Sequence, residues 1–229
     1  MGVPAVKELV ILMVFLVFFL EGTVWAQERI SLPQPKTVGE MSVEEAIFRR
    51  RSVRAFRDEA LTLSELSQVL FAAQGVTEKT RGFRTAPSAG ALYPLGLYAV
   101  VGKVEGIAPG VYRYYPEEHA IERVIEGDKR MELFRSALYQ ESIQEAPLVL
   151  VFTAIYERTT RRYGERGIRY VHMEVGHAAQ NVYLEAQALR LATVAIGAFR
   201  DEEVARILQL PQNEMPLYLM PVGKPKSGR

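Results

Sequence analysis

Cysteine is absent from this 229-residue chain, and histidine and tryptophan are scarce, with three copies and one copy. Without cysteine the protein has no disulfide, no thiolate nucleophile and no cysteine-ligated metal. Neither sign of charge dominates, because 28 basic side chains face 27 acidic ones. The resulting net charge of +1 creates no overall field that would attract nucleic acid, so we expect no nucleic-acid partner.

Several motifs that define enzyme classes are missing too. The chain has no Walker motif, no Gly-x-Gly-x-x-Gly motif and no Gly-x-Ser-x-Gly elbow. A metal site would need His119, His172 and His177, but the last two are five residues apart and would lie on different faces of a helix. Glu174-x-x-His177 is half of a di-iron pair without its second half. We therefore expect no metal site, and we expect His177 to pack or hydrogen-bond on a helix.

One long apolar run is present, Leu9–Leu20, and it follows Lys7. Its twelve residues are too few for the about 20 of a membrane span, but they match the ~7–15 residues of a signal-peptide core. We predict a signal peptide over residues 1–26, cut after Ala26, and export to the periplasm or cell envelope. An uncleaved membrane anchor is the alternative, and only then do we expect contact with a membrane.

Residues 27–40 contain Pro33, Pro35 and Gly39 and are predicted to be a linker. The chain as a whole is 48% hydrophobic and 24% charged, which is typical of globular proteins. Residues 41–229 are numerous enough to form one domain with a substantial core.

Capping boxes mark two helix starts, because Ser42-Val-Glu-Glu45 and Thr62-Leu-Ser-Glu65 predict helices that run toward Arg50 and Gly75. The longest helical pattern covers residues 170–191 and follows a polar arm at 158–169. The pattern as a whole indicates an α+β fold with one mixed sheet wrapped by helices. Apolar runs predict strands at residues 95–102, 111–116, 120–125, 147–155, 193–199 and 217–222, with 147–155 central because both of its faces are apolar.

A basic cluster lies between Phe48 and Phe56, where the sequence reads FRRRSVRAF. Arg50, Arg51, Ser52 and Arg54 offer several hydrogen-bond donors in a short stretch, and the planar fork of arginine suits phosphate oxygens. The cluster is a candidate clamp for a cofactor phosphate. The alternative is a solvated face at the end of a helix.

Three later segments can complete a cofactor pocket. The small residues of TAPSAGALYP, residues 85–94, let the backbone approach a flat ligand, although a plain turn is the alternative. An Ile-Gly-Ala-Phe turn follows at 196–199, and lysines end the chain. FMN needs parts of this kind, because cations and hydroxyls bind its phosphate and unhindered backbone donors lie near its ring.

Five segments resemble those of the nitroreductase-like flavoproteins, in the form found in the SagB/ThcOx subgroup. The resemblance covers about Met41–Lys226 and implies an FMN-binding α+β fold, with a mixed or antiparallel sheet wrapped by helices, in an intertwined homodimer. It also implies an oxidoreductase that passes hydride or electrons through flavin N5, to or from a small molecule or peptide, with NADH or NADPH as candidate donor. The segments are FRRRSVRAF, APSAGALYPLGLYAV, YGERGIRYVHMEVGHAAQNVYL, LATVAIGAF and PVGKPK.

The resemblance also assigns roles to individual residues. The resemblance implies that the cofactor phosphate and ribityl chain lie near Arg50, Arg51, Ser52 and Arg54. It implies that the flavin ring lies near Pro87, Ser88 and Ala89, and flavin N5 near Ile196, Gly197 and Ala198. Lys224 or Lys226 is expected to contact the phosphate as well.

One position departs from the subgroup. Members that mature peptides by oxidising azolines carry a Lys-Tyr pair where this chain has Arg162-Tyr163. Arginine stays protonated and is a poor base, which argues against azoline oxidation here. Tyr163 is the candidate catalytic residue, as an acid or hydrogen-bond donor, and a packed aromatic role is its alternative. The alternative function is a non-catalytic flavin-binding protein of the envelope.

Overall fold

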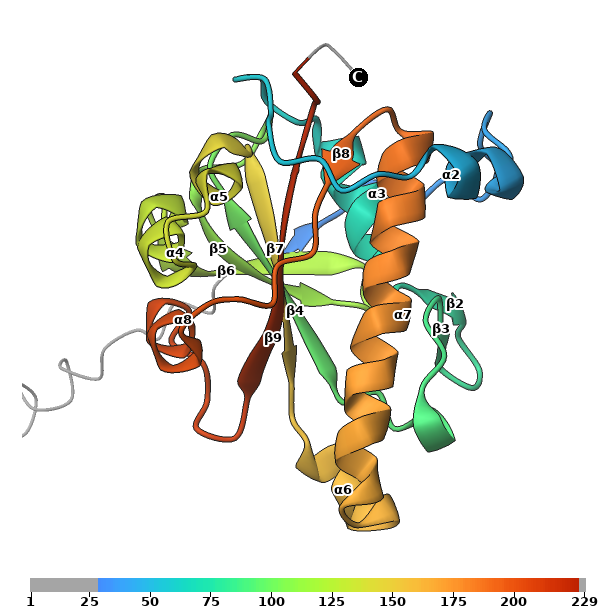
Figure 1. Ribbon diagram of the computed structural model, residues 1–229. Coiled ribbons are helices and arrows are strands. Elements are labelled where there is room, and N and C mark those ends of the chain that lie inside the picture. The colour runs from blue at the N-terminus through green and yellow to red at the C-terminus, as the bar shows by residue number, and fades with distance from the viewer. Residues whose placement is uncertain (1–28, 227–229) are drawn as a thin grey trace, which may run out of the picture.

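The structure is a computed structural model that describes residues 29–226. The predicted signal peptide therefore lies outside the described residues. A seven-stranded sheet in the order β1-β6-β5-β4-β7-β9-β8 forms the centre of the molecule, and its paired strands are antiparallel (Figure 1). The predicted α+β class is confirmed. Its strands are β1 (Ile30–Ser31), β4 (Leu95–Val101), β5 (Gly110–Tyr115), β6 (Ala120–Glu126), β7 (Leu148–Ala154), β8 (Ala192–Thr193) and β9 (Met215–Gly223).

The helices cover both faces of the sheet (Figure 1). One face packs on α3 and α7 through alternate residues such as Leu95 and Leu97, and the other face buries Tyr98 and Val100 with α4 and α8. Strand β7 is buried along its whole length, which confirms its predicted central place. The helices are α2 (Val43–Arg49), α3 (Leu63–Gln74), α4 (Arg130–Ser136), α5 (Glu141–Glu145), α6 (Glu157–Tyr163), α7 (Arg166–Ala188) and α8 (Asp201–Ile207).

Both predicted capping boxes mark real helix starts. Ser42 Oγ accepts from the Glu45 N–H at the start of α2. At the start of α3, Thr62 and Glu65 each accept a hydrogen bond from the other's backbone N–H. These local bonds satisfy helix donors that have no partner within the helix.

Other segments differ from the prediction. The polar arm at 158–169 is helical, because it forms most of α6 and the first turn of α7. Only Ala192–Thr193 of the late strand pairs as a strand, and Ile196 makes an isolated bridge to Leu219. The segment predicted as a linker supplies β1, and a small hairpin joins β2 (Val76–Glu78) to β3 (Phe83–Arg84). Among residues 29–226, no helix is both long enough and apolar enough to span a bilayer.

Candidate active site

The predicted clamp follows α2 and lies beside the C-terminal half of α7. Ser52 pairs with Thr193, and the Val53 N–H donates to the Thr193 carbonyl at 3.0 Å. Ser52 Oγ lies 3.0 Å from the hydroxyl of Tyr183, a residue of α7. These contacts hold the Arg50–Arg54 segment against the helix.

The three arginines of the clamp have different surroundings. The guanidinium of Arg50 lies 5.2 Å from the ring centre of Tyr183, within cation–π range. Arg54 is exposed and makes no ion pair within the described part of the chain. Arg51 donates to the carbonyl oxygens of Phe48, at 2.9 Å, and of Arg50, at 2.8 Å. Arg50 and Arg54 are therefore the cations best placed to receive an anion.

The late turn lies at the same end of α7. The Tyr183 hydroxyl accepts from the Ala195 N–H at 2.7 Å, so one tyrosine joins the clamp to this turn. Ile196 is buried and exchanges two hydrogen bonds with Leu219, at 2.9 and 3.0 Å. Gly197 and Ala198 are exposed, and a Cβ added to Gly197 would meet nothing closer than Tyr218 at 3.5 Å. Their backbone is thus open to a ligand.

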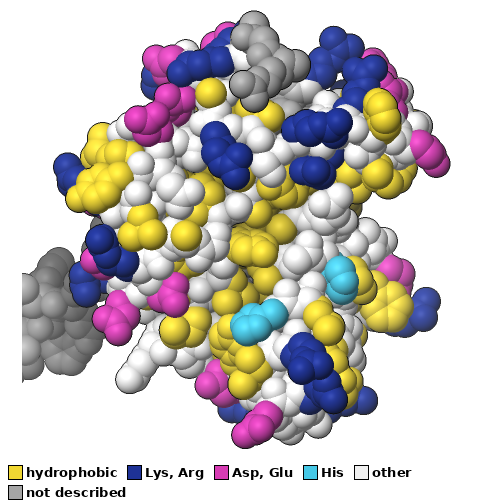
Figure 2. Space-filling model, in the orientation of Figure 1, with side chains coloured by type: hydrophobic (Ala, Val, Ile, Leu, Met, Phe, Trp, Pro, Cys, Tyr) yellow, Lys and Arg dark blue, Asp and Glu magenta, His cyan; other side chains and the backbone are white. Residues whose placement is uncertain are grey.

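The C-terminal lysines complete this group. The Lys226 N–H donates to the Ala55 carbonyl at 3.1 Å, which places the chain end beside the clamp segment. Lys224 Nζ lies 3.4 Å from Glu59, and Lys226 Nζ lies 3.1 Å from Glu145. On the face drawn in Figure 2, basic side chains gather at the top, and apolar atoms line the hollow below them.

The small-residue loop lies elsewhere on α7. Asn181 Nδ2 donates to the Thr85 carbonyl at 3.3 Å, and Ser88 Oγ accepts from the Tyr93 N–H at 2.9 Å. Gly90, with φ of 64°, lies beneath Tyr163: a Cβ added there would be 2.7 Å from the Tyr163 hydroxyl. The structure therefore brings Tyr163 to the loop that contains Pro87, Ser88 and Ala89.

The structure does not bring these two groups together within one chain. Glu174, which faces the loop through Ser88, precedes Tyr183 by nine residues. At about 100° and 1.5 Å per residue, the two side chains leave the helix in roughly opposite directions and about 13 Å apart along its axis. Asn181 lies on the Glu174 side, because seven residues return to almost the same face. The clamp and the loop thus occupy opposite faces of α7.

Sequence reasoning missed Tyr183 altogether, and it considered Glu174 only as a metal ligand. Tyr183 anchors both the clamp and the late turn. Glu174 is only 2% exposed, and its Oε1 has no hydrogen-bond partner among the described residues. Burial raises the pKa of Glu174 to about 7, although contacts with Ser88 and Arg84 oppose the rise. The sequence pattern that could have predicted the burial of Glu174 is an acidic residue on a helix face whose other residues are small or apolar.

Two of the three histidines take structural positions, but His177 is exposed and its side chain makes no hydrogen bond within residues 29–226, so the expectation that it packs or hydrogen-bonds is wrong. His172 Nε2 lies 2.7 Å from the Tyr156 hydroxyl, and His119 bonds to Ser67 and Tyr114. Within residues 29–226, no group of three histidine or acidic side chains is arranged to hold a metal ion.

Residues 47–224 match the sequence profile of the nitroreductase family. The chain belongs to the nitroreductase family. A Methanocaldococcus jannaschii protein provisionally named a nitroreductase is 53% identical over 195 residues, which cover 85% of this chain and 96% of that protein. A crystal structure of a nitroreductase-type protein from Ralstonia eutropha aligns with a TM-score of 0.78 at 30% identity, covering 90% of this chain and 93% of that one. The family resemblance and the fold are therefore confirmed.

More distant relatives of this nitroreductase-family chain have named activities. The microcin B17-processing protein McbC of Escherichia coli is 31% identical over 147 residues, and the match spans 61% of this chain and 54% of McbC. An FMN reductase (NADPH) of Bacillus subtilis is 23% identical over 195 residues, covering 79% of this chain and 65% of the reductase. The prediction of an FMN-dependent oxidoreductase is confirmed as the enzyme class. The roles of individual residues stay predictions.

Proposed function

We propose that the FMN phosphate binds to Arg50, Ser52 and Arg54, with Lys224 or Lys226 beside it. Arg50 and Arg54 support this proposal, because two guanidinium groups without an acidic partner in the described region suit a phosphate dianion. The lysines contribute less charge, because each already lies near a carboxylate. Arg51 acts by fixing the backbone that carries its neighbours.

The flavin ring is proposed to lie against Ile196, Gly197 and Ala198. Within residues 29–226, the N–H groups of Gly197 and Ala198 donate to no other backbone group, so they can donate to an acceptor on the ring edge. Ile196 holds the turn against β9 through its bridge to Leu219. Bound FMN supplies the redox chemistry, because it accepts a hydride equivalent and returns electrons to a second substrate.

The site is proposed to be completed by a second copy of this chain. The clamp and the Pro87–Ala89 loop lie on opposite faces of α7, so one chain cannot close both around one ligand. A two-fold dimer brings the loop of one protomer to the clamp of the other, twice. Exposed apolar side chains on α2, which leads into the clamp, agree with such an interface: Val43, Ile47 and Phe48 are 64%, 57% and 79% exposed.

Tyr163 is proposed to face the substrate side of the site as a hydrogen-bond donor or acid. It lies over Gly90 together with Arg162, whose Nη1 would be 3.1 Å from an added Cβ at that glycine. Arg162 stays protonated, so it serves an anionic or carbonyl substrate as a donor and removes no proton. We propose a nicotinamide nucleotide as electron donor and a small molecule, with a peptide as second candidate, as acceptor.

The first test uses the purified full-length chain. We expect it to take up about one FMN per protomer, the stoichiometry of a two-fold dimer with two shared sites. Anaerobic addition of NADPH or NADH should then bleach the flavin absorbance. A protein that takes up no added FMN contradicts the proposed cofactor site.

A second test separates the shared site from a site within one chain. Arg54→Ala removes a clamp cation, and Ala89→Trp blocks the loop, so each variant alone should bind FMN poorly. Mixed and refolded together, the two variants should recover about one quarter of the sites, because random pairing makes half of the dimers mixed and each has one intact site. Recovery of no sites contradicts the proposed sharing.

The location of the protein is also a proposal. We propose that residues 1–26 direct export and are removed, on the basis of the apolar run described above. Amino-terminal sequencing of the protein from a fractionated host should begin at Gln27. A mature protein that begins at Met1 contradicts cleavage.

A further inference from the structure

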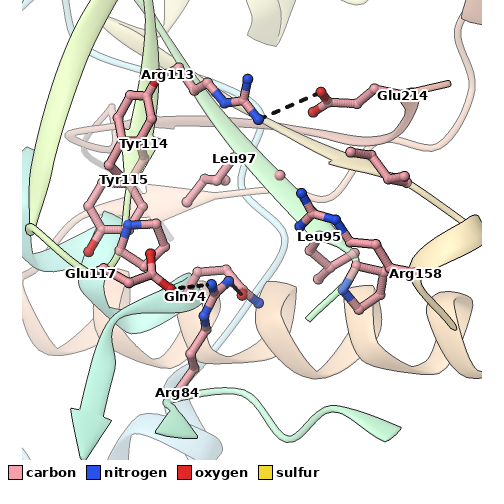
Figure 3. Close-up of a pocket in the computed structure, with 14 residues that line it drawn as sticks. Gln74, Arg84, Leu95, Leu97, Arg113, Tyr114, Tyr115, Glu117, Arg158 and Glu214 are labelled. Atoms are coloured by element: carbon pink, nitrogen blue, oxygen red, sulfur yellow. Dashed lines mark hydrogen bonds and ion pairs between the residues drawn. The ribbon is translucent and has the colours of Figure 1, made fainter. Parts of the chain in front are cut away.

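A pocket of about 270 Å³ lies where the central sheet splits between two strands. Strand β4 pairs with β7 from Leu95 to Val101, but with β5 only from Tyr98 to Val101. The strands diverge beside Leu95–Leu97, and side chains from both faces of the sheet reach the gap (Figure 3). None of the predicted cofactor residues lines this pocket.

The split leaves peptide groups of β4 directed at the pocket. The Ile155 N–H donates to the Pro94 carbonyl at 3.0 Å, so this carbonyl faces β7. Successive residues of a strand direct their peptide groups to alternate sides. The N–H and C=O groups of Leu95 and the N–H group of Leu97 therefore face the gap, where β5 no longer pairs with them.

Three arginines and two carboxylates line the pocket. Figure 3 shows Arg84 with Glu117 on one side, Arg113 with Glu214 on another, and Arg158 on a third. The first pair is separated by 2.8 Å and the second by 3.9 Å. Arg158 donates to the Tyr93 carbonyl at 3.2 Å and has no acidic partner in the described part of the chain. The lining therefore carries one positive charge in excess.

Two buried donors on the lining have no acceptor among the described residues. They are Gln74 Nε2 and Arg84 Nε, and Gln74 is only 1% exposed. The orientation of Gln74 is set by its oxygen, which accepts from Arg84 Nη1 at 3.0 Å. An unpaired buried donor is costly, and a small rotation of either side chain toward an acceptor in the pocket would remove that cost.

We propose that this pocket binds a small carboxylic acid as its monoanion. One carboxylate matches the single excess positive charge, whereas a phosphate dianion would exceed it. The apolar side chains of Leu95, Leu97 and Ile155 would contact the body of the acid. The volume is slightly below the ~300–1,000 Å³ of sites for drug-sized ligands, so the acid is small. This site is separate from the proposed FMN site and does not depend on it.

The test titrates FMN-loaded full-length protein with cyclohexanecarboxylate in a calorimeter. This saturated acid does not stack on a flavin, and cyclohexanecarboxamide has nearly the same shape without the charge. We expect saturable binding of the acid and none of the amide. Arg158→Gln should weaken binding about tenfold or more, the scale of a lost charge-assisted hydrogen bond. Arg161→Gln, on the same helix but outside the pocket, should leave affinity unchanged.

Each other outcome overturns the proposal. It fails if the acid shows no saturable binding, if the amide binds equally well, or if inorganic phosphate binds more tightly than the acid. It also fails if Arg158→Gln and Arg161→Gln have the same effect. Arg158→Lys, which keeps the charge and loses the planar fork, should fall between wild type and Arg158→Gln. Circular dichroism of each variant shows whether the fold is intact.

Discussion

Within residues 29–226, Arg54 makes no ion pair, and the guanidinium of Arg50 has the ring of Tyr183 as its only partner. Replacing either by alanine should weaken FMN binding by about 1.5–3 kcal/mol, the usual contribution of a hydrogen bond to a charged group. Arg49→Ala is the matched control, because Arg49 pairs with Glu45 at 2.8 Å on the surface of α2. Fluorescence titration with FMN measures all three. Equal losses in Arg49→Ala and Arg54→Ala would contradict the clamp assignment.

Glu174 should make the stability of the protein depend on pH. Its folded-state pKa of about 7 lies above the ordinary value of 4.5, so the folded state holds its proton more tightly. Stability is therefore lost as pH rises from the ordinary pKa to the folded one, by on the order of 3 kcal/mol. Glu174→Gln keeps the shape and removes the charge, so it should gain stability relative to wild type as the pH is raised.

Urea unfolding of wild type and Glu174→Gln at about pH 5 and about pH 8 measures this effect. The difference in unfolding free energy between the two proteins should be larger at the higher pH. A difference that does not change with pH would show that Glu174 titrates as an ordinary exposed acid.

At the scale of elements, the loop over α7 depends on Gly90. Its φ of 64° is unfavourable for other residues, and an added Cβ would come within 2.7 Å of the Tyr163 hydroxyl. Gly82 has a similar φ of 68° with nothing within 4 Å of an added Cβ. Gly82→Ala should therefore cost only the backbone strain, about 1–2 kcal/mol, and Gly90→Ala should cost more. Chemical denaturation compares them, and equal costs would mean that Tyr163 does not contact this loop.

Elements whose signals are local were predictable. The capping boxes at Ser42 and Thr62 marked their helices because a few neighbouring side chains satisfy the helix ends. The arm at 158–169 was predicted as irregular because it is polar throughout, yet α6 forms there by packing against α7. The segment after Thr193 has strand-like residues, but beyond Ile196 it finds no strand partner in the part of the chain that the structure describes. Packing between elements decided the first case, and the extent of pairing with a strand distant in sequence decided the second.

At the scale of the whole molecule, the apolar side of α2 should be covered by a second copy. Phe48, the most exposed of its apolar residues at 79%, is the best position to test this. Phe48→Ser should shift the protein toward monomer in analytical ultracentrifugation, because desolvating an exposed aromatic side chain favours association. FMN affinity should fall with it, since each proposed site needs two chains. A Phe48→Ser protein that stays dimeric would place the interface elsewhere.

The sequence by itself determined the family, the enzyme class and the segments from which the candidate site is built, because these depend on residue types in a fixed order. It also determined Arg50, Ser52 and Arg54 as neighbours, because they are neighbours in the chain. Only the tertiary structure decided that Tyr183 joins the clamp to the late turn and that Glu174 is buried behind Ser88. It alone showed that α7 holds the clamp and the loop on opposite faces. The reason is physical. The helix turns by about 100° per residue, so the sequence alone gives the side of the helix on which a residue lies. The groups that pack on that side come from strands and loops that are distant in sequence.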